Sequence, residues 1–172
     1  MYGDARDDEL RGVTTICSRG RLFFSVVHDV TNECVVVNVL RAYGLMASVT
    51  TGNSSRRLSI TKSKRPGRLD TSVRVFLVGE TSQGQTTKVI RDSNEPVYEQ
   101  SFCFHLGRHE VAEEVLIKLW VQEHDRFSRR SDIGLVTFQL RDLDDQAAPG
   151  DVMEIWRDIV LEKQVSLQGA SF

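Results

Sequence analysis

Two carboxylates set two residues apart make residues 122–134 a candidate cation site. Glu123 and Asp125 follow a strongly alternating apolar run, and in extended backbone such positions point to the same side. Calcium is a hard cation that takes several oxygen ligands at once, so carboxylates converging from adjacent loops would suit it. The alternative is a solvated turn of acidic and basic side chains, which spacing alone favours.

A second candidate site is a group of basic residues in a stretch without acidic residues between Cys34 and Leu69. The group comprises Arg56, Arg57, Lys62, Lys64, Arg65 and Arg68. Without these charges the formal net charge would fall from −2 to −8. Such a loop attracts anionic lipid headgroups, at about 1 kcal/mol for each basic residue near the membrane. The alternative is an insertion whose charges only keep it solvated.

Other features of this basic stretch bear on its partners and its regulation. No aromatic residue interleaves with the basic ones, as base stacking would require, so we expect no nucleic acid partner. Residues 56–59, with the letters RRLS, resemble a basophilic kinase site. A phosphate on Ser59 would add about −1.5 to −2 charges and weaken attachment to an anionic lipid surface.

Catalytic motifs are absent from the sequence. It contains no G-x-S-x-G, no glycine-rich phosphate loop and no pair of histidines with metal-ligand spacing. The four histidines, His28, His105, His109 and His124, are scattered. We therefore expect a binding module and not an enzyme.

The composition predicts the architecture that must position these loops. The chain has 172 residues, enough for one domain with a substantial core. Val, Ile and Thr total 39 residues against 7 Ala, and β-branched side chains favour sheets over helices. A helical bundle or an α/β protein would require more Ala. Hydrophobic residues at 40% and charged residues at 27% are typical of a folded chain.

Short runs of alternating hydrophobicity predict eight strands from Arg21 onward. The expected strands lie near residues 22–27, 34–40, 72–78, 86–91, 99–106, 114–122, 134–140 and 155–161. Turns are expected at 31–33 and 82–85, and short helical turns at 109–114 and 142–146. The sixth strand alternates best and should bury Val115, Ile117, Leu119 and Val121. Strands this closely spaced predict an all-β antiparallel sandwich.

The remaining features concern boundaries and compartment. We expect a flexible acidic tail at 1–19, a folded domain at 20–163 with a basic insertion at 46–69, and a C-terminal tail at 164–172. Three cysteines without a C-x-x-C pair argue against disulfides or zinc and fit a reducing, cytoplasmic compartment. Cys34 and Cys103 lie within alternating apolar runs, where a buried role is expected. No signal peptide or membrane span is evident.

Several fragments, in one order along the chain, carry a family resemblance. They are GRLFFS (20–25) with VVVNVLRAYGL (35–45), DTSVRVFL (70–77), TKVIR (87–91) with EPVYEQSFCF (95–104), DRFSR (125–129) and WRDI (156–159). Together they resemble a synaptotagmin-type C2 domain over residues 20–163. The resemblance implies an eight-stranded antiparallel β-sandwich that binds phospholipid membranes and fusion proteins such as SNAREs. Many members do so with calcium held by five aspartates in two loops.

The resemblance also implies which residues of this chain stand at the family's calcium-binding positions. Asp70 matches the second aspartate of the first loop, whereas the first aspartate has no counterpart because the basic insertion takes its place. In the other loop Glu123 replaces an aspartate, Asp125 keeps one and Ser131 stands where the last belongs. Asp132 is one residue out of register.

The family's lysine-rich fourth strand is neutral here, leaving Lys88 and Arg91 as candidate lipid contacts together with the basic insertion. We therefore expect a membrane-phospholipid and protein-binding module in vesicle trafficking and exocytosis, with weak or absent calcium binding. It would be peripheral at a membrane or vesicle, in a parent protein that carries any anchor elsewhere. The first alternative is a calcium-dependent phospholipid sensor using Asp70, Glu123, Asp125 and Asp132. The second is a module that binds only proteins.

Overall fold

The structure is a computed structural model that describes residues 18–47, 68–79, 83–106, 114–125, 127, 129–144, 148 and 150–161. Most of the basic insertion lies outside the described residues: Arg56, Arg57, Ser59, Lys62, Lys64 and Arg65. Arg68 is the one member of the basic group that is described.

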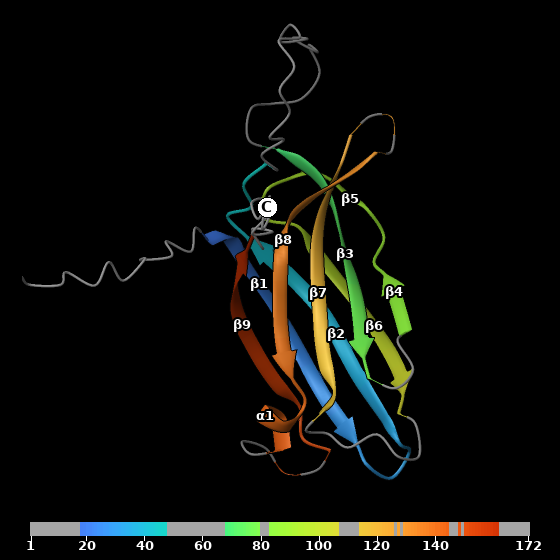
Figure 1. Cartoon of the computed structure of the whole chain (residues 1–172). Coiled ribbons are helices and arrows are strands. Elements are labelled where there is room, and N and C mark those ends of the chain that lie inside the picture. The colour runs from blue at the N-terminus through green and yellow to red at the C-terminus, as the bar shows by residue number, and fades with distance from the viewer. Residues whose placement is uncertain are drawn as a thin grey trace, which may run out of the picture.

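The described chain forms β-strands and one short helix (Figure 1). The strands are β1 (Ser18–Asp29), β2 (Cys34–Tyr43), β3 (Leu69–Val78), β4 (Gln83–Thr86), β5 (Ile90–Ser93), β6 (Val97–His105), β7 (Leu116–His124), β8 (Arg130–Gln139) and β9 (Met153–Val160). The helix α1 (Arg141–Asp144) follows β8 and overlaps the helical turn expected at 142–146. The expected all-β class is confirmed.

All strand pairs are antiparallel, in the order β4-β3-β7-β8-β9-β1-β2-β6, with β5 also paired to β3. One layer of the sandwich contains β4, β3, β7 and β8, and the other contains β9, β1, β2 and β6 (Figure 1). The layers join where β8 meets β9 through the pair Leu135 and Val160. The turn expected at 31–33 connects β1 to β2, and both carboxylate oxygens of Asp29 accept hydrogen bonds from Asn32 (3.0 and 2.6 Å).

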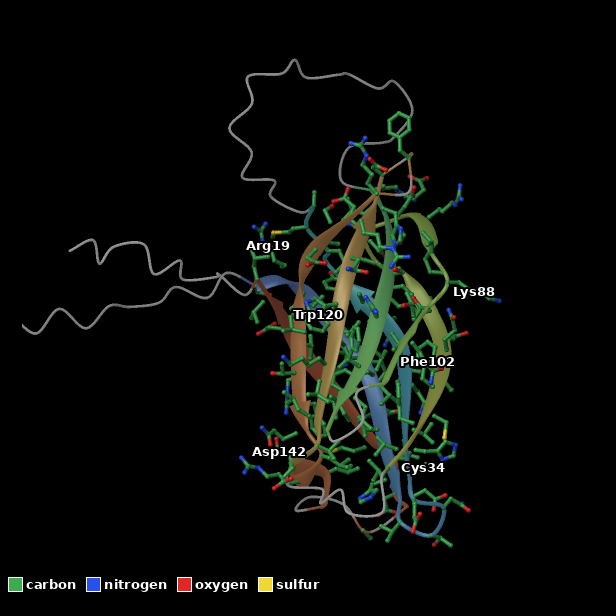
Figure 2. The ribbon with its side chains drawn as sticks, turned by 45° about the vertical axis from the view of Figure 1, so that its right-hand side comes forward. Arg19, Cys34, Lys88, Phe102, Trp120 and Asp142 are labelled. Atoms are coloured by element: carbon green, nitrogen blue, oxygen red, sulfur yellow. The ribbon has the colours of Figure 1, made fainter. Side chains whose placement is uncertain are left out.

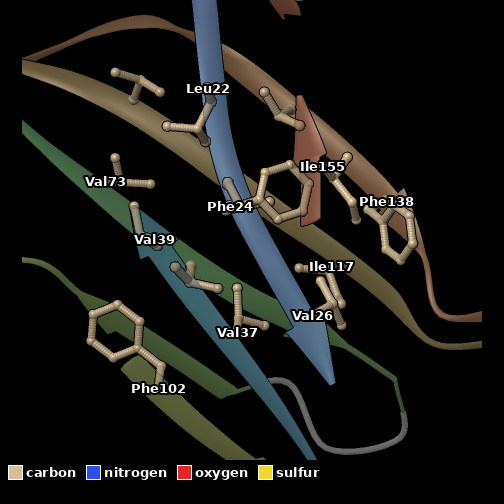
Figure 3. Close-up of a cluster of buried hydrophobic side chains, with 14 of the residues drawn as sticks. Leu22, Phe24, Val26, Val37, Val39, Val73, Phe102, Ile117, Phe138 and Ile155 are labelled. Carbon is tan, nitrogen blue, oxygen red and sulfur yellow. The ribbon is translucent and has the colours of Figure 1, made fainter. Parts of the chain in front are cut away.

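The core fills the space between the two layers (Figure 3). Leu22, Phe24 and Val26 of β1 face Val73 and Ile117 of the other layer as members of one buried cluster. The inward row expected along the sixth predicted strand is confirmed, because Val115, Ile117, Leu119 and Val121 are all fully buried. Burial of apolar area at about 25 cal/mol per Å² is the main force that holds the layers together.

Two details differ from the sequence-based expectations. The strand expected at 86–91 is two strands, and the expected turn at 82–85 contains most of β4. The polar letters QGQT show no alternation, yet they pair with β3, where Gly84 lies opposite Phe76. A side chain at Gly84 would come within 2.7 Å of the Phe76 ring, so glycine lets the edge strand pass over that ring.

The second difference concerns Cys103. Cys34 is buried as expected, but Cys103 is exposed. Phe102 and Phe104 take the inward positions of β6, so alternation turns the residue between them outward. Burial and a hydrogen bond with the Cys103 thiol raise the pKa of the Cys34 thiol to about 11.

A bulge in β8 decides where the acidic loop residues point. Val121 pairs with Gly134, but the next residue, Gln122, pairs with Asp132, so Ile133 is an extra residue on β8. Ile133 is buried. Because a one-residue shift exchanges the two faces of a strand, the bulge fixes the side on which Asp132 lies.

Candidate functional site: an acidic loop end and a cation–aromatic basin

The acidic loop end comprises Asp70, Asp92 and Asp125, with the basic residue Arg68 beside them. Asp70 belongs to β3, and one of its carboxylate oxygens accepts a hydrogen bond from the backbone N–H of Asp92 in β5 (2.9 Å). Arg68 donates to the carbonyl oxygen of Asp92 (2.9 Å), and its guanidinium lies 3.9 Å from the Asp92 carboxylate. The basic insertion thus ends in a cation, Arg68, that lies against Asp92 of the acidic loop end.

Asp125 organises the loop between β7 and β8. Its Oδ1 accepts hydrogen bonds from the backbone N–H groups of Phe127 and Arg129, both at 2.8 Å. Its own N–H donates to the carbonyl of Arg129 (3.0 Å), which closes the turn. One oxygen of this carboxylate therefore accepts hydrogen bonds from the backbone of its own turn, a role that Asp residues commonly take in turns. The side chain of Phe127 at the tip of this turn is 68% exposed.

The other two candidate ligands, Glu123 and Asp132, face different neighbours. Glu123 pairs with Thr71 of β3 and with Ser131 of β8 in the sheet register. Asp132 pairs with Gln122, and its Oδ1 accepts a hydrogen bond from the Gln122 amide (2.8 Å). Within the described residues no group of three or more His, Cys, Asp or Glu side chains is arranged to hold a metal ion.

His124, at the end of β7, connects this acidic region to the sheet. Its Nε2 lies 2.8 Å from the hydroxyl of Ser72, which is fully buried, so this contact is structural. Partial burial lowers the pKa of His124, and the nearby Arg130 lowers it further. The carboxylates of Asp70 and Asp125 act in the opposite direction but do not outweigh these effects.

A second site lies on the outer side of β3 and β7, where cations alternate with aromatic rings. Arg74 pairs with Trp120, and Phe76 pairs with Lys118. The guanidinium carbon of Arg74 lies 4.2 Å from the Phe76 ring centroid, and Nζ of Lys118 lies 5.6 Å from that of Trp120. The two rings meet edge to face, with centroids 5.4 Å apart. Each cation is thus held over a ring by quadrupole attraction.

We call this second site the basin; it is a recess of about 450 Å³. It is lined by Arg74, Phe76, Val78, Lys118, Trp120, Gln122 and Asp132. Trp120 lies over the middle of β7 (Figure 2). β4 passes alongside the basin, since Gly84 packs against the Phe76 ring. The β8 bulge places Asp132 at the rim of the basin, beside Gln122.

Sequence reasoning missed the basin and named other cations. Three of the cations that it named are described, Arg68, Lys88 and Arg91, and none of them lines the basin. Lys88 and Arg91 are exposed on the segment between β4 and β6, and Lys88 lies at the side of the sandwich away from Trp120 (Figure 2). Neither Arg74 nor Lys118 is among the binding residues expected from the sequence. The signal that could have found them is the pattern of a cation and an aromatic residue two apart on both β3 and β7.

Comparisons with known proteins agree with this fold. Residues 33–158 match the family model of the C2 domain. Synaptotagmin-1 of Aplysia californica is 31% identical over 140 residues, which are 81% of this chain and 28% of that protein. Human synaptotagmin-5 is 30% identical over 140 residues, covering 81% of this chain and 31% of the relative. The chain thus spans less than a third of the length of these relatives.

Solved structures show the same architecture at lower identity. A C2 domain of RIM from Drosophila superposes with a TM-score of 0.61 at 20% identity, covering 83% of this chain and 99% of that one. The first C2 domain of human synaptotagmin XIII gives a TM-score of 0.55 at 17% identity, covering 83% and 88%.

The chain belongs to the C2 domain family. It is a synaptotagmin-like C2 domain, a class of modules that bind membranes and proteins. No helix of the described residues is long and apolar enough to span a membrane.

Proposed function

We propose that this C2 domain attaches to anionic phospholipid membranes without calcium, through the basin. The observation that carries the proposal is the alternation of Arg74 and Lys118 with Phe76 and Trp120 over one recess. Cations that are already held over rings lose less conformational freedom when they bind a phosphate. The basic insertion would add long-range attraction to the same class of lipid.

The acidic loop end supports the calcium-independent part of the proposal. One carboxylate oxygen of Asp70 already accepts a hydrogen bond from the backbone N–H of Asp92. One carboxylate oxygen of Asp125 accepts hydrogen bonds from two backbone N–H groups of its own loop. Arg68 contributes a positive charge at a position where a divalent cation would need negative charge. The carboxylate count is also low, because Ser131 is neutral and Asp132 points toward the basin.

Exposed apolar side chains at the turn between β7 and β8 and just after β2 offer an apolar contribution to the same attachment. Phe127 is 68% exposed and Met46 56% exposed. Large apolar side chains on loop tips gain free energy when they enter the headgroup region of a bilayer. In a synaptotagmin-like domain, this attachment supports a role at the cytoplasmic surface of vesicles or their target membranes during trafficking.

Liposome co-sedimentation tests the proposal. Vesicles of phosphatidylcholine with phosphatidylserine and phosphatidylinositol bisphosphate should bind the wild-type chain equally in EGTA and in calcium. Arg74→Glu with Lys118→Glu should lower the affinity at least about tenfold, since each basic residue contributes about 1 kcal/mol at such a surface. Rising salt should weaken binding by screening.

The matched control is Arg141→Glu with Arg157→Glu, which changes the net charge equally at exposed positions outside the basin. Unchanged binding of the basin variant would overturn the basin as the attachment site. Binding that appears only with calcium would replace the proposal with the calcium sensor. Reversal of Arg56, Arg57 and Lys62 measures the separate contribution of the insertion.

A further inference from the structure

A second aromatic surface lies on the other layer of the sandwich, across β9, β1, β2 and β6. We call it the Trp156 surface. In the sheet register Phe23 lies between Trp156 and Arg41, and Arg41 in turn pairs with Val97. Two residues along each strand, Arg21 lies between Asp158 and Tyr43. Their inward neighbours Leu22, Ala42 and Ile155 are buried, so these two rows form the outer side of the layer.

The centre of the Trp156 surface is a platform of stacked rings and cations. The rings of Phe23 and Trp156 stack with centroids 4.8 Å apart and planes 20° apart. The guanidinium carbon of Arg41 lies 5.5 Å from the Phe23 centroid and 5.7 Å from that of Trp156. Arg21 lies 5.3 Å from the Trp156 centroid. Two guanidinium groups therefore lie against these rings in the unbound domain.

The platform borders a recess of about 440 Å³ with exposed apolar edges. Tyr43 is 58% and Val97 52% exposed, and both line the recess with Trp156. Tyrosine, tryptophan and arginine are the side chains most enriched at the energetic centres of protein interfaces. These residues form one continuous patch across neighbouring strands, which differs from a scatter of single exposed residues.

The charges on this surface favour a carboxylate-bearing partner. Arg21 is 3.6 Å from Asp158, but both side chains are more than half exposed, so that pair exchanges easily. The guanidinium of Arg41 lies over two rings and makes no hydrogen bond or ion pair with another described residue, so its N–H groups are left to donate. A planar guanidinium binds a carboxylate through two parallel hydrogen bonds.

The distribution of these charges favours a peptide over a lipid surface as the partner. Asp158 and Glu95 lie at opposite sides of the two arginines, so the surface presents positive charge at its centre and negative charge at its margins. An anionic bilayer presents uniform negative charge, so the carboxylates of Asp158 and Glu95 at the two margins would repel it. A peptide with one acidic residue between large apolar side chains matches the centre and the apolar edges.

We propose that the Trp156 surface docks a peptide segment of a partner protein. A carboxylate of the peptide pairs with Arg41, and flanking apolar side chains pack on Tyr43, Val97 and Trp156. The basin lies on β3 and β7 of the other layer, so the domain can hold a membrane and this peptide at separate sites. The inference goes beyond the proposed lipid attachment and does not depend on it.

A library of random peptides displayed on phage and selected on the whole 172-residue chain tests the inference. Enriched peptides should carry Asp or Glu beside Phe, Leu, Ile or Trp. A synthetic copy of the dominant peptide is then titrated while the fluorescence of Trp156 is followed in a Trp120→Phe background. Arg41→Glu should weaken binding about tenfold or more, the loss expected for a charge-assisted hydrogen-bonded pair.

Several variants separate docking from a general loss of structure. Arg41→Lys keeps the charge but not the planar stacking, so it should weaken binding less than Arg41→Glu. Tyr43→Ala should weaken binding while thermal unfolding stays unchanged. A peptide with Lys in place of its acidic residue should recover affinity for Arg41→Glu, and the basin variant Arg74→Glu with Lys118→Glu should bind the original peptide normally.

Two results would overturn the inference. One is a selection without acidic–apolar enrichment, or enriched peptides that bind the Arg41→Glu chain as well as the wild type. The other is loss of liposome binding in Arg41→Glu with no effect on peptides, which would assign the Trp156 surface to the membrane. Liposome binding of the basin variant is a separate measurement, and its result tests only the proposed function.

Discussion

The backbone N–H of Asp92 donates to the carboxylate of Asp70 (2.9 Å), and Arg68 donates to the carbonyl of the same Asp92 (2.9 Å). A short chain of contacts thus runs from the last residue of the basic group to the aspartate that the family resemblance assigns to calcium. The protein's own groups supply a donor and a positive charge at this loop end.

Calcium binding is therefore expected to be absent at micromolar concentrations. One carboxylate oxygen of Asp70 is already engaged by the N–H of Asp92, and Asp132 would have to turn away from Gln122. Isothermal titration calorimetry checks this, with Asp125→Asn as the control. Saturable binding below about 100 μM that Asp125→Asn abolishes would contradict the expectation, since such an affinity requires several converging oxygens.

Ile117→Ala should destabilise the fold by about 2–5 kcal/mol. Ile117 is fully buried near the start of β7, so the change removes apolar contacts and leaves a cavity between the layers. Urea unfolding followed by circular dichroism measures the free energy. Thr137→Ala, at an exposed position of the neighbouring strand, should change it by less than about 0.5 kcal/mol. Equal effects of the two changes would argue against this packing.

Gly134→Ala should cost about 1–3 kcal/mol of folding free energy, the usual range for overpacking. A methyl group there would lie 2.7 Å from Cγ2 of Ile159 and 2.7 Å from the carbonyl oxygen of Val160. The second of these atoms is backbone and cannot rotate away, so β8 and β9 would have to separate. The same urea experiment, with Thr137→Ala as reference, measures the effect. A variant as stable as the wild type would show that the layers adjust here.

Stability should fall in mildly acidic solution because of His124. Its pKa in the fold is lower than the ordinary value of 6.5, so the folded state favours the neutral ring. This contribution is complete above pH 6.5 and is lost as the pH falls through the lowered folded pKa. Arg130 opposes protonation, while Asp70 and Asp125 favour it. Urea unfolding between pH 7.5 and 5 should show a smaller decline for His124→Gln than for the wild type.

An equal decline in the two proteins would assign the acid sensitivity to other groups. Nuclear magnetic resonance titration of the His124 ring gives an independent check, because its midpoint should lie below that of an exposed histidine. A midpoint above 6.5 would show that the carboxylates of Asp70 and Asp125 outweigh burial and Arg130.

The sequence by itself determined the fold class and most of the core. Alternation at Val115, Ile117, Leu119 and Val121 needs only the two-residue period of a strand, so one face could be assigned without knowing its neighbours. The excess of β-branched residues over alanine and the ordered family fragments pointed to the same antiparallel sandwich. These are local properties, which is why they could be read along the chain.

The tertiary structure decided which side chains become neighbours across paired strands. Pairing of β3 with β7 brings Arg74 to Trp120 and Phe76 to Lys118, residues more than forty positions apart whose individual letters predict nothing. The extra residue at Ile133 turns Asp132 toward the basin, because a bulge reverses the face alternation of the strand on one side of it relative to the other. The Phe23 and Trp156 stack likewise depends on the first and last strands becoming neighbours. Register is a property of strand pairs, and a single sequence specifies it only through the fold.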